Sequence, residues 1–306
     1  MNVLHMKYAV EVANTGSINK ASELLLIAQP NLSRSIKELE ADLGITIFER
    51  TRKGMTLTPE GDEFIGYAKR ILSQISDVEK IYREGKKQKR KFSVCTPRAT
   101  YISDAFVNFS NLIGKEETEV FYKETNSSLA IKNVLSSEYK LGIVRYAANY
   151  DKYFKTLFDD KGLHYEVVSE FRYVLIMGKK CPLAGLDEIH FSDLSDYIEI
   201  AHADPYVPSL SLSEVMHEEL ADTIKRRIFV FERGSQFELL SENNETFMWV
   251  SPITDRTIER FGLVQRECPD NDKVYKDVLI YRNDYNLSDL DNLFITELCK
   301  SKRRYL

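Results

Sequence analysis

The chain has 306 residues, of which 43% are hydrophobic and 29% are charged. This composition is that of a folded globular protein, and the length exceeds one ordinary domain. No stretch approaches the ~18 apolar residues of a membrane span, and no apolar leader follows Met1, so we expect a cytoplasmic protein with no membrane partner.

Charge is distributed unevenly about a formal net value of −5. Residues 1–91 carry 16 Lys and Arg against 12 Asp and Glu, whereas residues 92–306 carry 26 against 35. A basic head on an acidic body favours a nucleic-acid partner at one end of the molecule. The four cysteines form no CxxC pair and the five histidines have no ligand spacing, so we predict reduced thiols and no metal site.

Two short helices are expected between Gly16 and Gly44. Ser17 is a suitable N-cap, and Ile18, Ala21 and Leu25 follow at helical spacing. Pro30 suits the first turn of a second helix, which Gly44 ends. On this second helix one face is apolar and the other polar. The apolar face holds Leu32, Ile36, Leu39 and Leu43, and the polar face holds Ser33, Arg34 and Lys37.

A β-hairpin with a basic tip should follow, formed by residues 45–48 and 55–57 around the turn 50–54. Helix, tight turn, polar-faced helix and basic wing are together the means of entering a major groove and gripping the flanking backbone. The alternative is a small helical subdomain with a solvated charged face. We expect base-edge and phosphate contacts, with Arg34 reading a guanine and the wing on the backbone or minor groove. The expected DNA-binding residues are Gln29, Pro30, Ser33, Arg34, Lys37, Arg50, Arg52 and Lys53.

A long helix is expected from Pro59 to about residue 86, with Thr58 as its cap. Apolar residues recur along it with steps of four and three, which is a heptad seam that favours pairing with a second copy. The seam comprises Phe64, Ala68, Ile71, Ile75, Val78 and Tyr82. The alternative is a helix that lies on its own domain. The basic run 85–91 then predicts a hinge, so the domains are expected at 1–58, 59–91 and 92–306.

From Phe92 onward, short apolar runs alternate with helical segments, which predicts parallel sheets with crossover helices in two α/β lobes. Strands are expected at 92–95, 119–122 and 141–144 in the first half, at 173–177 leaving it, and at 197–200, 228–231 and 247–250 in the second half. Helices are expected at 101–109, 128–135 and 236–240. Residues 276–282 and the helix 287–299 should return to the first half.

Ligands of open α/β lobes settle beyond the carboxyl ends of strands, often on helix N-termini. The segments 96–100 and 124–128 offer hydroxyls and amides at such places, and Arg145 could form a bidentate fork with an effector carboxylate. The expected effector-binding residues are Arg98, Thr100, Thr125, Ser127, Ser128, Arg145, His202 and Trp249. The alternative for each is a structural role, such as a helix cap or a surface ion pair.

The N-terminal fifth of the chain resembles the DNA-binding domain of the LysR-type transcriptional regulators. The resemblance is carried by Gly16-Ser17-Ile18, Ala21, Leu25, Gln29-Pro30, Leu32-Ser33, Ile36, Leu39-Glu40, Leu43-Gly44, Phe48, Arg50, Leu57-Thr58 and Gly61. Ala28 departs from it, standing where the family usually has a capping Ser or Thr.

The resemblance implies a winged helix-turn-helix domain, a coiled-coil linker helix and a two-lobed effector domain like the periplasmic binding proteins. It further implies a homodimer or homotetramer that binds operator DNA, responds to a small-molecule effector and acts on RNA polymerase. Some family members sense oxidants, which remains open for the cysteines.

No catalytic motif such as GxSxG, a Walker A loop or HExxH occurs, and no cofactor is expected. The rival interpretations are a small-molecule-binding enzyme with a helical N-terminal appendage, and a solute-binding protein.

Overall fold

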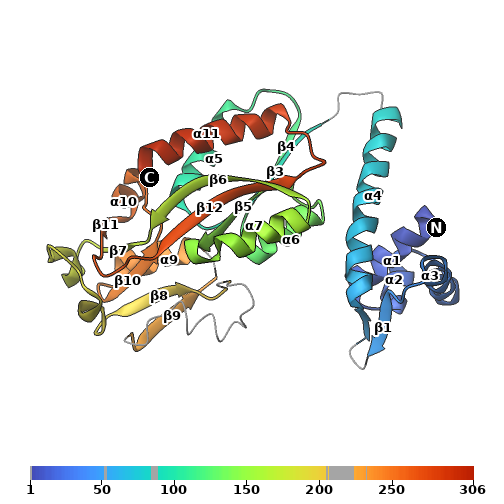
Figure 1. Ribbon diagram of the computed structural model, residues 1–306, viewed down its shortest axis with the longest axis horizontal. Coiled ribbons are helices and arrows are strands. Elements are labelled where there is room, and N and C mark those ends of the chain that lie inside the picture. The colour runs from blue at the N-terminus through green and yellow to red at the C-terminus, as the bar shows by residue number, and fades with distance from the viewer. Residues whose placement is uncertain (1, 52–53, 84–88, 205, 207–223, 232) are drawn as a thin grey trace. The chain divides into compact units, whose positions relative to one another are not determined.

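The computed structural model describes residues 2–51, 54–83, 89–204, 206, 224–231 and 233–306, without the side chains of residues 77 and 80–83 (Figure 1). The chain divides into two compact units. The first comprises Met1–Gln88 and the short segment Leu135–Ser137, and the second is built from Lys89–Val134 and Glu138–Leu306. The units are treated separately below.

The first unit is three helices, a hairpin and a long helix. Its elements are α1 (Val3–Thr15), α2 (Ile18–Leu24), α3 (Gln29–Leu43), β1 (Phe48–Thr51), β2 (Gly54–Leu57) and α4 (Pro59–Arg83). The Ser17 side chain accepts a hydrogen bond from the Lys20 amide at the start of α2, and left-handed Gly44 ends α3, as predicted. Ala28 provides no side-chain cap for α3. The apolar faces of α1 and α3 meet in one core that includes Ala9, Leu32 and Leu39.

The first strand of the hairpin was predicted three residues too early, at 45–48. The segment before Phe48 is held by groups other than a partner strand. The Glu40 carboxylate accepts the amides of Ile47 and Phe48 at 2.7 and 3.2 Å, and the Ile47 carbonyl accepts the Thr58 amide at 3.1 Å. Pairing with β2 therefore begins at Phe48, opposite Leu57, and includes Arg50 opposite Met55.

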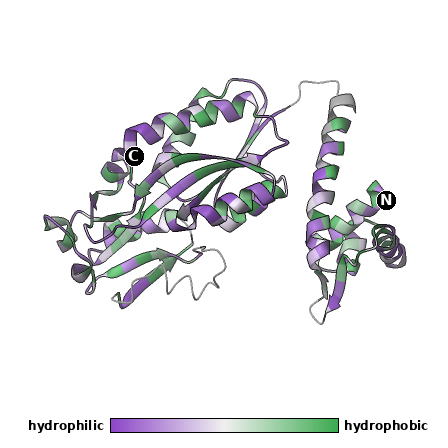
Figure 2. Ribbon diagram, in the orientation of Figure 1, coloured by the Kyte–Doolittle hydropathy of each residue, from purple (hydrophilic) through white to green (hydrophobic). Residues whose placement is uncertain are grey.

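Helix α4 begins where the sequence predicts. The Thr58 hydroxyl accepts the Gly61 amide at 2.9 Å and donates to the Thr46 carbonyl at 2.6 Å. Gly61 is required by close approach, because a Cβ there would lie 2.1 Å from the Ile47 carbonyl oxygen. In Figure 2, hydrophobic and hydrophilic bands alternate along α4.

The described residues of the second unit form two five-stranded sheets, one in each lobe. The first sheet has the order β4-β3-β5-β12-β6 and the second β11-β7-β10-β8-β9. The strands of the first are β3 (Arg90–Thr96), β4 (Thr118–Glu124), β5 (Leu141–Ala147), β6 (Leu163–Arg172) and β12 (Val274–Arg282). Those of the second are β7 (Val174–Gly178), β8 (Ile198–His202), β9 (Arg226–Val230), β10 (Thr246–Val250) and β11 (Leu263–Arg266).

Helices accompany both sheets (Figure 1). The first lobe carries α5 (Thr100–Leu112), α6 (Ser127–Leu135), α7 (Asp151–Asp160) and α11 (Asp289–Tyr305), and the second α9 (Arg233–Glu242) and α10 (Asp255–Phe261). Short 3-10 turns lie at Ala148–Tyr150, Pro182–Gly185 and Phe191–Leu194. Phe92, Phe109 and Phe294 form an aromatic cluster in the first core, with ring centroids 4.5 to 5.8 Å apart.

The sheets are mixed, whereas parallel sheets were predicted. Strand β3 is parallel to β4 and β5, but β12 runs antiparallel to β5 and β6. The chain crosses between the lobes twice, at Tyr173 between β6 and β7, and between β11 and β12. A strand that arrives from the other lobe enters its sheet in the opposite direction. The return of β12 and α11 to the first lobe confirms the predicted two-lobed order.

Candidate functional site

The outer face of α3 is polar and exposed. Gln29, Pro30, Arg34 and Lys37 are exposed and Ser33 is half-buried, while Leu32, Ile36 and Leu39 face the core. The Arg34 side chain is 81% exposed, and its Nε donates to the Glu38 carboxylate one turn on at 2.9 Å. An exposed ion pair of this kind contributes little to stability, so the guanidinium can exchange partners at small cost.

The hairpin is attached to the turn that precedes α2. The Met55 amide donates to the Gly16 carbonyl at 2.9 Å, and a Cβ on Gly54 would lie 2.6 Å from the same oxygen. Arg50 is exposed on β1. Arg52 and Lys53, which were also predicted to contact DNA, lie outside the described residues.

The predicted seam of α4 divides into a buried and an accessible part. Ala68 is fully buried, and Phe64 packs against the core of its own unit. Ala68 therefore has no surface left for a partner, and its assignment to a dimer seam is corrected. Ile71 and Ile75 are half-buried and Val78 is 53% exposed, whereas the Tyr82 side chain is not described.

A cavity of about 460 Å³ lies in the second unit, between residues that follow strands of both lobes. Six predicted effector-binding residues line it, namely Arg98, Thr125, Ser127, Arg145, His202 and Trp249. Two others do not. The Thr100 hydroxyl is buried and accepts the Thr254 amide at 3.0 Å, and Ser128 is exposed at the start of α6 and not among the lining residues. Both positions are corrected.

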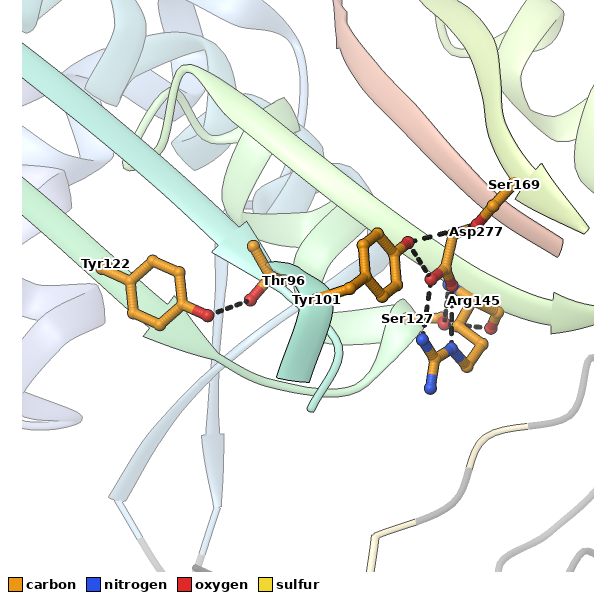
Figure 3. Close-up of polar contacts among 7 residues, drawn as sticks. All are labelled: Thr96, Tyr101, Tyr122, Ser127, Arg145, Ser169 and Asp277. Carbon is orange, nitrogen blue, oxygen red and sulfur yellow. Dashed lines mark hydrogen bonds and ion pairs between the residues drawn. The ribbon is translucent and has the colours of Figure 1, made fainter. Parts of the chain in front are cut away.

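Arg145 forms the predicted bidentate fork, but with an acid of the protein itself (Figure 3). Its Nε and Nη2 donate to the Asp277 carboxylate at 2.8 and 2.7 Å, because antiparallel pairing of β5 and β12 places the two residues opposite each other. Asp277 is fully buried and also accepts the Tyr101 hydroxyl at 2.5 Å. Burial lowers the pKa of Arg145, but the Asp277 charge and hydrogen bonds outweigh it and hold the pKa above its ordinary value.

Two ion pairs join the lobes across the cavity region. Arg98, which follows β3, donates to Asp204 after β8 at 2.8 and 3.3 Å, and to the Phe231 carbonyl at 2.8 Å. Arg233 at the start of α9 donates to Glu124 at the end of β4 at 2.6 Å. No pattern in the sequence predicts these long-range pairs. Asp277, in contrast, could have been noticed in the sequence, because it is an acidic residue inside an apolar run.

His202 enters the cavity wall as a neutral imidazole. Burial, followed by the nearby Arg98 charge, lowers the pKa of His202 to about 4. Its Nδ1 is buried and has no hydrogen-bond partner among the residues that the structure describes. Trp249 also lines the cavity, with the Phe191 ring at its edge and the two centroids 6.1 Å apart.

Comparison with known proteins decides the family. The model of the bacterial regulatory helix-turn-helix proteins of the lysR family matches residues 3–62, which span α1 to the start of α4. The transcriptional regulator AlsR of Bacillus subtilis is 25% identical over 72% of this chain and 70% of its own length. This chain belongs to the LysR family of transcriptional regulators.

Solved LysR-type structures share the fold over the whole chain. A full-length OxyR variant from Pseudomonas aeruginosa superposes with a TM-score of 0.59 at 15% identity, covering 100% of this chain and 99% of that one. Full-length CbnR, solved in complex with its target DNA, gives 0.59 at 17% identity, covering 98% and 100%. Some curated relatives align over only about a quarter of each chain. YcgK of B. subtilis is 47% identical over 26% of this chain and 24% of its own length.

Two further findings concern the described part of this LysR-type chain. No described helix combines the length and apolar character needed to cross a membrane. No cluster of three or more His, Cys, Asp or Glu side chains suited to a metal ion occurs among the described residues. Of the four cysteines, Cys95, Cys181 and Cys268 are buried, and burial raises the pKa of Cys95 to about 12.

Proposed function

We propose that this LysR-type regulator reads a specific operator sequence with α3 and changes its DNA-bound state when a small molecule occupies the cavity between its lobes. The observation that carries the proposal is the division of α3 into an apolar face that packs into the core and an exposed face with Arg34 and Lys37. Such a helix fits the major groove without uncovering the core.

Arg34 is the proposed reader of a guanine. Its guanidinium is held at one nitrogen by Glu38 on the same exposed face. A guanine offers the O6 and N7 acceptors that a guanidinium fork contacts together. Gln29, Pro30, Ser33 and Lys37 would contact neighbouring base edges and phosphates, and Arg50, with Arg52 and Lys53, would grip the backbone or minor groove.

The cavity is the proposed effector site. It lies where two lobes meet, and the Arg98–Asp204 and Arg233–Glu124 pairs connect those lobes beside it. A molecule bound between the lobes would alter their spacing and, through α4, the setting of the DNA-binding heads. Couplings of this kind are typically about 1–3 kcal/mol.

Helix α4 is the proposed site of assembly between copies of the chain. The accessible part of its apolar seam is proposed to pair with the same helix of a second copy, giving a homodimer and then a homotetramer on a partly palindromic site. The DNA-bound assembly would then present a changed surface to RNA polymerase.

A mobility-shift titration with the DNA upstream of the protein's own gene tests the proposal. We expect tighter binding to that fragment than to a scrambled duplex, with an affinity that falls as salt rises. No binding to either duplex at low salt would contradict it.

A further inference from the structure

The cations that line the cavity are already engaged by other groups of the protein. Arg145 is paired with Asp277 and Arg98 with Asp204. The Lys273 ammonium lies 5.5 Å above the centroid of the Tyr275 ring. These three cations are outnumbered by the acids of the lining, Glu199, Asp204, Asp270 and Asp272. The described wall therefore has no excess of positive charge.

The Arg145–Asp277 pair excludes a second carboxylate from the fork. Asp277 is fully buried, so a ligand that took the Arg145 Nε and Nη2 would leave a buried acid without its counter-charge. Only the third guanidinium nitrogen, which points away from Asp277 in Figure 3, has no hydrogen bond within the described part of the chain. It can donate to one acceptor without disturbing the pair.

Aromatic rings supply much of the remaining wall. Tyr173 and Tyr275 stack with centroids 4.0 Å apart, and the indole of Trp249 lines the cavity from the other lobe. A volume of about 460 Å³ is within the range of small-molecule sites. Neutral His202 adds a polar edge without charge. Rings and isolated polar groups suit a flat, weakly polar molecule.

We infer that the effector of this cavity is an uncharged aromatic molecule with a carbonyl or hydroxyl acceptor, and not a carboxylate. The inference rests on the proposed function in that it takes the cavity as the effector site. Arg145 donates one hydrogen bond to the acceptor, and the rings contact the aromatic body. Burying a carboxylate among cations that are already neutralised is unfavourable, since its charge would lose water without gaining a partner.

The single tryptophan of the chain provides the readout. Full-length protein is titrated with benzamide and with benzoate, which share size and shape and differ in charge, while Trp249 emission is followed. We expect benzamide to bind more tightly by about tenfold or more. Equal or tighter binding of benzoate overturns the inference, as does a titration in which neither molecule changes the emission.

Asp204→Asn gives the matched test, because it frees the Arg98 charge while leaving an acceptor in place. Benzoate affinity should rise by about tenfold in this variant. Asp160→Asn, an exposed position on α7 that is not part of the lining, should leave both affinities unchanged. No gain for benzoate in Asp204→Asn would contradict the charge argument. Operator binding is measured on the same preparations. It tests the proposed DNA-binding function separately from the inference about the effector.

Discussion

Leu26 adopts a backbone conformation that leucine disfavours, in the turn that separates α2 from α3. Its φ is 55° and it is 91% exposed, so no burial compensates the strain. We predict that Leu26→Asn raises the free energy of unfolding by about 1 kcal/mol, measured by chemical denaturation. Leu24→Asn, exposed but helical, is the control and should lower it by a few tenths of a kcal/mol. Destabilisation by the Leu26 change would contradict the backbone strain assigned to this turn.

The Asp277 carboxylate neutralises Arg145, which lines the cavity. Asp277→Asn should lower the free energy of unfolding by about 3–5 kcal/mol, because it leaves the buried Arg145 uncompensated. Asp284→Asn removes the acid of an exposed pair with Arg282 and should change it by less than about 1 kcal/mol. Equal effects of the two variants would contradict the role given to Asp277.

At the scale of elements, the junction between the hairpin and α4 depends on one glycine. Gly61→Ala would force a Cβ against the Ile47 carbonyl, and we expect a loss of about 3 kcal/mol in the free energy of unfolding. Gly66→Ala on the same helix has open space around it and should instead gain up to about 1 kcal/mol. The two changes should thus have opposite signs in denaturation curves.

Helix α4 is expected to pair through its exposed apolar positions. Val78→Glu places a charge on the accessible part of the seam and should convert the assembly to a smaller species in sedimentation velocity. Glu79→Ala, on a neighbouring exposed position, should leave the assembly intact. An unchanged mass for Val78→Glu would remove this face from the interface.

Elements built from local signals were predictable from sequence. Ser17, Gly44 and Thr58 cap or end helices through groups within a few residues of themselves, and the structure places each as expected. Strand β6 and helix α7 were not predicted. Strand β6 is an edge strand in which Glu166 and Glu170 interrupt the apolar pattern. Helix α7 has only a short apolar signal, in which Phe154 and Phe158 lie four apart on its buried side.

At the scale of the whole molecule, the limits of sequence reasoning are those of long-range pairing. The two-lobed order was predictable, and six of the predicted effector-binding residues line one cavity because strand ends gather ligand groups; that they bind an effector stays a prediction. The side chains that pair with those residues could not be predicted from the sequence. Asp277 lies opposite Arg145 only because β12 returns from the other lobe, and Asp204 meets Arg98 only because the lobes face each other. These pairs decide the charge of the cavity.

The central claim is that α3 reads a DNA sequence, and Arg34 tests it most directly. Arg34→Ala is compared with wild type in binding to the operator and to a scrambled duplex at one salt concentration, with Arg303→Ala, at an exposed position of α11, as the control. We expect operator affinity to fall by about 1–3 kcal/mol, a smaller loss on the scrambled duplex, and no change for the control. Equal losses on both duplexes would contradict the reading of bases by this helix.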